Sequence, residues 1–177
     1  SGTAGSSTFS YNGDGQVTSV ADAAGTTGYG YDSAGRLAQL TDPATGTTLS
    51  YGYNSLSQVS QVSYGSGGNT RSFGYNSLHQ LTSDTLATHA GASVASISYG
   101  YDLNGNLTSK TAKGFAGAAA NTYSYDEANR ITSWNNGATT TSYGYDGNGN
   151  RTKAGAATYA YDARDQLTSD GTSTYSY

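Results

Sequence analysis

Tyr29-Gly30-Tyr31-Asp32-Ser33-Ala34-Gly35-Arg36-Leu37 is the clearest of several similar stretches in this sequence. Its two tyrosines are separated by one glycine, which is typical of a β-strand that presents an aromatic face on one side. An aspartate followed three residues later by glycine favours a type I turn whose fourth residue is left-handed. The stretch therefore predicts a β-hairpin with a three-residue loop, in which Tyr31 faces Leu37 and Tyr29 faces Gln39.

The same pattern occurs eight times, and a ninth copy begins at Tyr175. The left-handed turn positions are Gly15, Gly35, Ser57, His79, Gly105, Asn129, Gly149 and Asp165, and all except Ser57 are residue types that tolerate a positive φ. The expected tyrosine–aliphatic pairs are Tyr11–Val17, Tyr31–Leu37, Tyr53–Val59, Tyr75–Leu81, Tyr101–Leu107, Tyr125–Ile131 and Tyr161–Leu167, whereas Tyr145 faces Arg151. The repeat predicts an all-β fold of consecutive antiparallel hairpins that form a spiralling sheet, a shell wall or a β-solenoid.

We expect one repeat array over residues 1–177, as part of a longer chain, with structural repeat residues in place of an active site. These are Tyr11, Tyr31, Asp32, Gly35, Tyr53, Tyr75, Tyr101, Asp102, Gly105, Tyr125, Asp126, Tyr145, Asp146, Gly149, Tyr161 and Asp162. The longest linkers between hairpins, from Asp84 to Ser96 and from Thr111 to Asn121, are of low complexity and are predicted to be surface loops.

The composition excludes several functional classes. The chain has no cysteine, so it holds no disulfide, thiolate metal site or cysteine nucleophile. Its net charge of -4 argues against binding to a nucleic-acid backbone, and no stretch is long and apolar enough to span a bilayer as a helix. Leu, Ile, Val and Phe make up only about a ninth of the residues, so the 17 tyrosines must supply the apolar surface.

Candidate catalytic, cofactor and metal residues all have a simpler explanation in the repeat, and none is predicted. His79 occupies a left-handed turn position, and His89 lies in an Ala/Gly-rich loop without a serine–aspartate arrangement near it in sequence. The repeated aspartates are explained by the turns. The stretches 102–106 and 146–150 resemble the first half of a calcium loop but lack its distal glutamate. Asn106-Leu107-Thr108 and Asn150-Arg151-Thr152 match glycosylation sequons.

The copies Tyr31-Asp32-Ser33-Ala34-Gly35-Arg36-Leu37 and Tyr101-Asp102-Leu103-Asn104-Gly105-Asn106-Leu107 resemble the Tyr-Asp (YD) repeat of Rhs proteins. The same repeat occurs in teneurins, the C component of insecticidal Tc toxins and bacterial wall-associated proteins. The resemblance implies a sheet that spirals into a hollow shell, which in bacterial members holds a toxin domain. The chain lacks the Asp-Pro-x-Gly-Leu stretch that closes such shells, so no self-cleavage is carried over to it.

The resemblance implies a non-enzymatic, secreted or cell-surface structural protein whose wall encloses a toxin or other cargo. Its partners would be the rest of a longer chain, or neighbouring copies joined through open β-edges. An alternative is an extracellular fibre or adhesin of stacked hairpins, in which rows of tyrosine bind surface glycans. The fibre predicts self-association with a defined axial repeat, and the shell predicts a much longer parent chain.

Overall fold

The computed structural model describes residues 5–115 and 119–177, and every regular element in them is a β-strand. The first compact unit, Ser1–Ser96, contains β1 (Thr8–Tyr11), β2 (Val17–Asp22), β3 (Gly25–Tyr31), β4 (Leu37–Thr41), β5 (Thr48–Tyr53), β6 (Val59–Tyr64), β7 (Thr70–Tyr75) and β8 (Leu81–Ala87). Strand β9 (Ser93–Tyr101) begins there and continues into the second unit, Ile97–Tyr177. The second unit also holds β10 (Leu107–Lys113), β11 (Ala120–Tyr125), β12 (Ile131–Asn135), β13 (Thr140–Tyr145), β14 (Arg151–Ala154), β15 (Ala157–Thr158), β16 (Ala160–Tyr161) and β17 (Leu167–Ser169).

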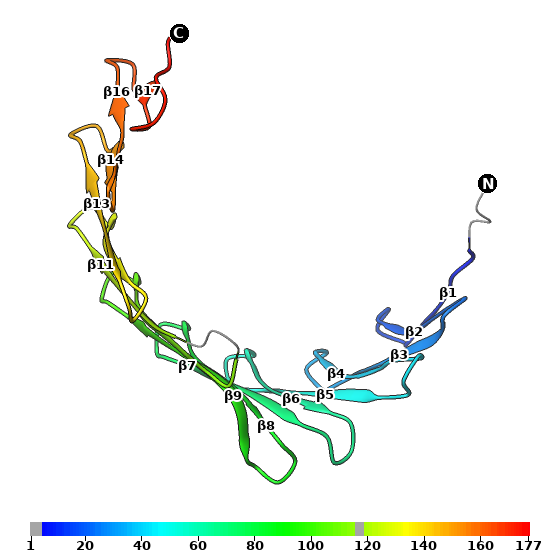
Figure 1. The fold of residues 1–177 in the computed structure, drawn as a ribbon. Coiled ribbons are helices and arrows are strands. Elements are labelled where there is room, and N and C mark those ends of the chain that lie inside the picture. The colour runs from blue at the N-terminus through cyan, green and yellow to red at the C-terminus, as the bar shows by residue number, and fades with distance from the viewer. Residues whose placement is uncertain (1–4, 116–118) are drawn as a thin grey trace. The chain divides into compact units, whose positions relative to one another are not determined.

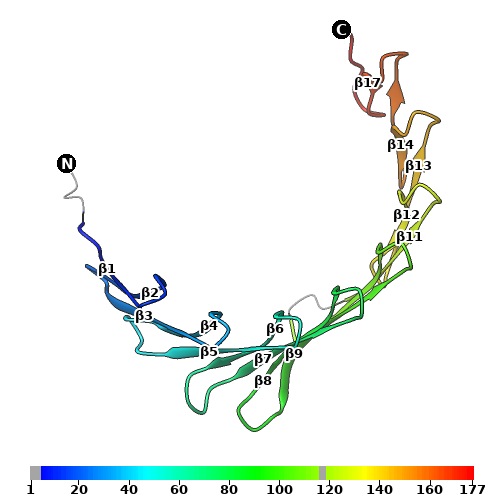
Figure 2. The same cartoon turned by 180° about the vertical axis from the view of Figure 1, so that it is seen from behind.

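Strands β1 to β15 are hydrogen-bonded neighbours in chain order, and β16 pairs separately with β17. The predicted fold class, an all-β succession of antiparallel hairpins, is therefore confirmed. Figures 1 and 2 show that the strands of each unit lie in a single layer. This connectivity is the simplest that a repeated hairpin can produce, because each strand pairs with the strand before it and the strand after it.

The eight repeat turns share one backbone geometry. In the second repeat the Asp32 N–H donates to the Arg36 carbonyl, and the Gly35 N–H donates to the Asp32 carbonyl, both at 2.9 Å. The left-handed residues are Gly15, Gly35, Ser57, His79, Gly105, Asn129, Gly149 and Asp165, with φ between 60° and 92°. The predicted turn is confirmed in every copy, including the copy where Ser57 stands in place of a favoured residue type.

The strand register confirms most of the predicted cross-strand pairs and corrects one. Tyr11–Val17, Tyr31–Leu37, Tyr53–Val59, Tyr75–Leu81, Tyr125–Ile131, Tyr145–Arg151 and Tyr161–Leu167 are partners. The prediction that Tyr29 faces Gln39 was wrong, because Tyr29 faces Leu40 and Gln39 faces Gly30. A β-bulge at Ala38 adds one residue to β4 and shifts the register beyond it.

The bulge recurs and changes which residues share a face. The extra residue is small or carries a hydroxyl in the seven repeats whose register is described: Thr18, Ala38, Ser60, Thr82, Thr132, Thr152 and Thr168. Because one residue is inserted, Leu37 and Leu40, three apart in sequence, both lie opposite tyrosines. The aromatic face of such a repeat thus gains a second apolar position.

The first of the two predicted surface loops is mostly strand, and the second is strand at both of its ends. Strands β8 and β9 take up all but Thr88–Ala92 of the first linker, and this remainder forms the same turn, with the Thr88 hydroxyl accepting from the Ala92 N–H at 3.2 Å. Strands β10 and β11 likewise extend into the second linker, whose residues 116–118 lie outside the described part of the chain. Low complexity misled the prediction, because alternating Ser, Thr and Ala side chains suit a strand as well as a loop.

A conventional core is absent from the part of the chain that the structure describes. Among residues 5–115 and 119–177, Ala95 is the only buried hydrophobic residue, at 6% exposure, and Asp84 is the only buried polar one, at 8%. The repeated tyrosines between the chain ends are half-buried, whereas Phe9, Tyr11, Tyr175 and Tyr177 are exposed. Packing within the sheet plane, between neighbouring strands, therefore takes the place of packing between layers.

The left-handed position should be sensitive to substitution, and one turn offers a matched comparison. Gly149 has φ +92°, whereas Gly147 in the same turn has no positive φ and open space around it. We expect Gly149→Ala to lower the free energy of unfolding by about 1 kcal/mol and Gly147→Ala to change it by less than about 0.5 kcal/mol. Urea unfolding of both variants measures the difference, and equal effects would contradict the turn geometry.

Candidate functional site

Within each unit, a series of tyrosine hydroxyls joins hairpins to the hairpin before them. In the first unit, the hydroxyls of Tyr31, Tyr53 and Tyr75 donate to the carbonyls of Val17, Leu37 and Val59 at 2.7–2.8 Å. In the second unit, those of Tyr125, Tyr145, Tyr161 and Tyr177 donate to the carbonyls of Leu107, Ile131, Arg151 and Leu167 at 2.9–3.2 Å. We call this series the tyrosine ladder.

The tyrosine ladder meets the backbone where the β-bulge interrupts the strand. Each acceptor residue is the one opposite the tyrosine of its own repeat, directly before the extra residue. A bulge disturbs the regular ladder of backbone hydrogen bonds. A carbonyl beside the bulge is therefore stabilised by a hydrogen bond from a side chain outside the strand pair. The second tyrosine of a repeat thus packs against its own hairpin and also hydrogen-bonds the preceding one.

The first residue of each turn is held by its side chain. Its Oδ1 accepts the backbone N–H of the residues two and four positions later, as in Asp32 with Ala34 and Arg36, both at 2.9 Å. Asn12 and Asn54 accept equivalent bonds with their amide oxygens. The carboxylate of Asp32 also pairs with Arg36 at 2.8 Å. The Asp126–Arg130 pair has the same separation, so each of these turns is closed by an ion pair.

These contacts lower the pKa of the turn carboxyls. For Asp32 and Asp126 the main cause is the hydrogen bond from the backbone N–H of Arg36 and Arg130. For Asp102 the main cause is the side-chain amide of Asn106. For Asp146, desolvation is the largest single cause and raises the pKa, but the hydrogen bonds from Asn150, Asn148 and Gly149 together outweigh it and the net pKa is lowered. All four aspartates are therefore acceptors committed to their own turns, which is a poor basis for acid–base chemistry.

The buried carboxylate of Asp84 belongs to an ion pair outside the turns. Arg71 Nε donates to Asp84 Oδ1 at 2.7 Å, and the guanidinium lies 5.2 Å from the centre of the Phe73 ring. This hydrogen bond raises the pKa of Arg71 above its usual value, so the pair stays charged. Asp84 faces Phe73, at the position where Leu40 faces Tyr29, so a charge pair replaces an aliphatic contact on the aromatic face.

The histidines take structural positions in turns. His79 has φ 64°, and its carbonyl accepts from Gln58 Nε2 at 3.2 Å. His89 lies in the Thr88–Ala92 turn. The described part of the chain contains no group of three His, Asp or Glu residues that could hold a metal ion. The calcium-like stretches are turns, because Asp102 Oδ1 and Asp146 Oδ1 accept backbone N–H groups.

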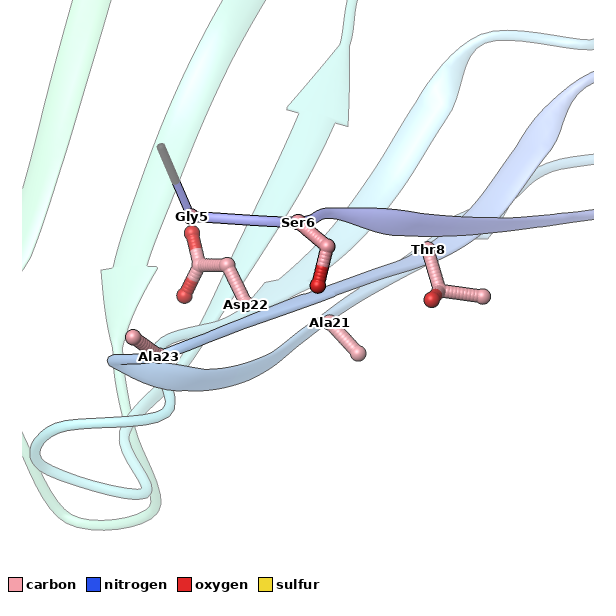
Figure 3. Close-up of a pocket in the computed structure, with 6 residues that line it drawn as sticks. All are labelled: Gly5, Ser6, Thr8, Ala21, Asp22 and Ala23. Atoms are coloured by element: carbon pink, nitrogen blue, oxygen red, sulfur yellow. The ribbon is translucent and has the colours of Figure 1, made fainter. Parts of the chain in front are cut away.

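One shallow pocket lies beside the start of β1 and the turn between β2 and β3. It is lined by Gly5, Ser6, Thr8, Ala21, Asp22 and Ala23, which Figure 3 shows as sticks. Asp22 is its only ionisable group, and Asp22 Oδ1 already accepts the Ala24 N–H at 2.8 Å. These residues include no nucleophile with a neighbouring base, so they do not make a catalytic set.

The two sequons coincide with turn contacts. Asn106 Nδ2 donates to Asp102 Oδ2 at 3.0 Å, and Asn150 Nδ2 donates to Asp146 Oδ2 at 3.1 Å. A glycan on either nitrogen would displace these bonds. In the residues that the structure describes, no helix has the length and apolar character needed to cross a membrane.

Comparison with protein families identifies the repeat. The family model described as RHS Repeat matches residues 11–47 and 31–68. The model described as Teneurin YD-shell matches residues 69–177, which is more than half of the chain. The chain belongs to the teneurin YD-shell family. The predicted resemblance to YD-repeat proteins is thereby confirmed, and the tyrosine ladder is a feature of its YD repeats.

Solved structures share the fold of this YD-repeat chain. The crystal structure of TcdB2-TccC3-Cdc42 matches with a TM-score of 0.69 and 18% identity, over 93% of this chain and 10% of that one. The TcdB2-TccC3 structure without its hypervariable C-terminal region matches with a TM-score of 0.70, 19% identity and the same coverage. The Tc holotoxin pore of Photorhabdus luminescens, with a mutation in TccC3, matches with a TM-score of 0.63 and 20% identity, over 92% of this chain and 9% of that one. The chain thus spans about a tenth of each of these chains, and no curated protein sequence matches it.

Two features of the YD repeat were missed in the sequence. One is the second apolar position, which the spacings Val17/Val20, Leu37/Leu40 and Val59/Val62 could have revealed as a departure from strand periodicity. The other is the acceptor of each tyrosine hydroxyl. This acceptor is a backbone carbonyl oxygen, which every residue has, so the residue type does not reveal it.

The tyrosine ladder predicts a difference between two tyrosines on one strand. Tyr53→Phe removes the bond to the Leu37 carbonyl and should lower the free energy of unfolding by about 0.5–1.5 kcal/mol. Tyr51→Phe should have little effect, because Phe73 occupies the corresponding position of the next repeat. Chemical denaturation of the two variants tests this, and equal losses would contradict a role for the Tyr53 hydroxyl.

The turn aspartates predict a loss of stability in acid. Their pKa values are lower in the folded chain than the value of about 3.9 in unfolded peptides, so each contributes stability that is complete above that value. This contribution is lost as the pH falls below about 4 and through the folded pKa values. A variant with Asn at 32, 102, 126 and 146 keeps the Oδ1 acceptors, as Asn12 and Asn54 do, and should lose less stability on acidification. Urea midpoints from pH 7 to pH 2.5 measure this, and equal slopes would contradict it.

Proposed function

We propose that the chain is a non-enzymatic wall segment of a secreted or cell-surface YD shell that encloses a toxin or other cargo. The tyrosine ladder carries this proposal. Its hydrogen bonds tie the hairpins of Tyr31, Tyr53 and Tyr75 each to the preceding one, so a row of such repeats can form a continuous wall one layer thick. Membership of the teneurin YD-shell family and a fold shared with TcdB2-TccC3 chains support this role.

The partners follow from the same geometry. We propose that the repeats belong to one array. The described edge strand β1 is exposed along its whole length, so the rest of a longer chain would pair with it. The second partner is the cargo that such a wall encloses. Neither nucleic acid nor a cofactor has a place in this proposal, because the chain is acidic and its polar side chains serve the turns.

The alternative function is an extracellular fibre or adhesin that binds surface glycans. One observation favours it. The tyrosine rings are only half-buried, and aromatic rings of this kind can stack on sugars. The shell and the fibre use the same hairpins, and they differ in whether the repeats close around cargo or associate end to end.

Electron microscopy of the full natural protein, combined with its intact mass, tests the proposal. The shell predicts discrete hollow particles and a chain several times longer than 177 residues, whereas filaments with a defined axial repeat would overturn it. The combined variant Tyr31→Phe, Tyr53→Phe and Tyr75→Phe removes three of these hydrogen bonds and should weaken the wall, so that a protease cleaves the cargo faster than in the wild type. Tyr51→Phe serves as the matched control and should leave the cargo protected.

A further inference from the structure

In several repeats, one residue of the turn hydrogen-bonds the turn of the following repeat. This is the residue four positions after the first turn residue, such as Gln16 after Asn12, and we call it the closing residue. In the first unit this closing residue is long. Gln16 Nε2 donates to the Gly35 carbonyl at 2.8 Å, and Gln58 Nε2 donates to the His79 carbonyl at 3.2 Å. Arg36 Nη1 donates to Ser57 Oγ at 3.0 Å. In every case the acceptor belongs to the left-handed residue of the following turn.

In the second unit two closing residues are asparagines, which are shorter. Asn106 Nδ2 donates to Asn129 Oδ1, and Asn150 Nδ2 donates to Asp165 Oδ1, both at 2.7 Å. The same two acceptors each receive a second amide at 2.9 Å, from Asn104 and Asn148. Here the left-handed residue supplies its side chain as the acceptor.

Side-chain length explains the difference. Glutamine and arginine are long enough to reach the backbone or a short side chain of the next turn, whereas asparagine has one methylene fewer than glutamine. An asparagine therefore needs an acceptor that projects toward it, and Asn129 and Asp165 provide one. Asparagine and aspartate are also among the few residues that tolerate φ values of 60° and 61°.

The space around the left-handed residues fits the same explanation. A Cβ at Gly35 would lie 3.4 Å from Gln16 Nε2, so a side chain there would approach the long donor closely. At the junction of Arg130 with Gly149, the corresponding Cβ would lie 3.8 Å from Arg130 Nη1. Both distances are ordinary van der Waals contacts, so they permit a Cβ. Accordingly the long donors Gln16 and Arg130 are followed by glycine, the long donors Arg36 and Gln58 by Ser57 and His79, and the short donors by Asn129 and Asp165.

We propose that the closing residue of one turn and the left-handed residue of the next form a compatibility rule that specifies which repeat can follow which. A long donor is compatible with a glycine, a backbone carbonyl acceptor or the short Ser57 side chain in the next turn, whereas an asparagine donor requires an Asn or Asp side chain there. The rule concerns contacts between adjacent hairpins, so it goes beyond the proposed shell function and holds equally for a fibre.

A double-mutant cycle in the full chain tests the rule at Asn106 and Asn129. Asn129→Gly should shift the unfolding equilibrium toward the unfolded state by about three- to tenfold, because Asn104 and Asn106 lose their acceptor. In the Asn106→Arg background the same change should cost nothing, because that double variant reproduces the native arrangement of Asp126, Arg130 and Gly149. Effects of Asn129→Gly that agree within about twofold in the two backgrounds would overturn the rule.

His79→Gly is the matched control for loss of a left-handed side chain. Gln58 donates to the backbone carbonyl of His79, which glycine retains, so this variant should be as stable as the wild type or more stable. A loss equal to that of Asn129→Gly would contradict the rule. Native-state hydrogen exchange at the two turns provides a second measurement. If the Asn129→Gly variant does not fold, folding of the double variant would still support the rule, and failure of the double variant would overturn it.

Discussion

The hydrogen bond from a tyrosine hydroxyl to a carbonyl of the preceding hairpin is the contact on which the rest of this structure depends. A single layer of strands has no second layer to bury its apolar face, and almost no side chain in the described residues is buried. The aromatic ring covers the pair formed by its own hairpin, and its hydroxyl extends the contact to the neighbour. One side chain thus provides both apolar contact and a directional bond between repeats.

The β-bulge makes this arrangement possible. It places two aliphatic residues, such as Leu37 and Leu40, opposite the two tyrosines of a repeat, and it brings a carbonyl to the hydroxyl of the following repeat. The turn, the bulge and the tyrosine form one unit that repeats along the chain. This is why the spacing between repeats can vary while the geometry within each repeat stays the same. A wall built in this way can be extended repeat by repeat without a new core.

Much of this could be read from the residues. The spacing of Asp32 and Gly35 predicted the turn, and the pairing of Tyr31 with Leu37 followed from it. The predicted partner of Tyr29 was wrong, because no distinctive residue type marks the bulge at Ala38 in the sequence. The strands on both sides of the Thr88–Ala92 turn were taken for a loop, because Thr88 replaces the usual Asx and the flanking residues are small. The assignment of the repeated aspartates to turns was right for Asp32, whose Oδ1 accepts two N–H groups of its own turn.

Local features were accessible from sequence because their causes lie within a few residues. A turn is fixed by the φ that Gly35 permits and by the N–H groups that Asp32 accepts, all inside a five-residue segment. The acceptor of each tyrosine hydroxyl was decided only by the tertiary structure. That acceptor is a backbone carbonyl 10 to 18 residues earlier, in another hairpin, and every residue has such a group. Only the register of the folded sheet selects one carbonyl from the many that the chain offers.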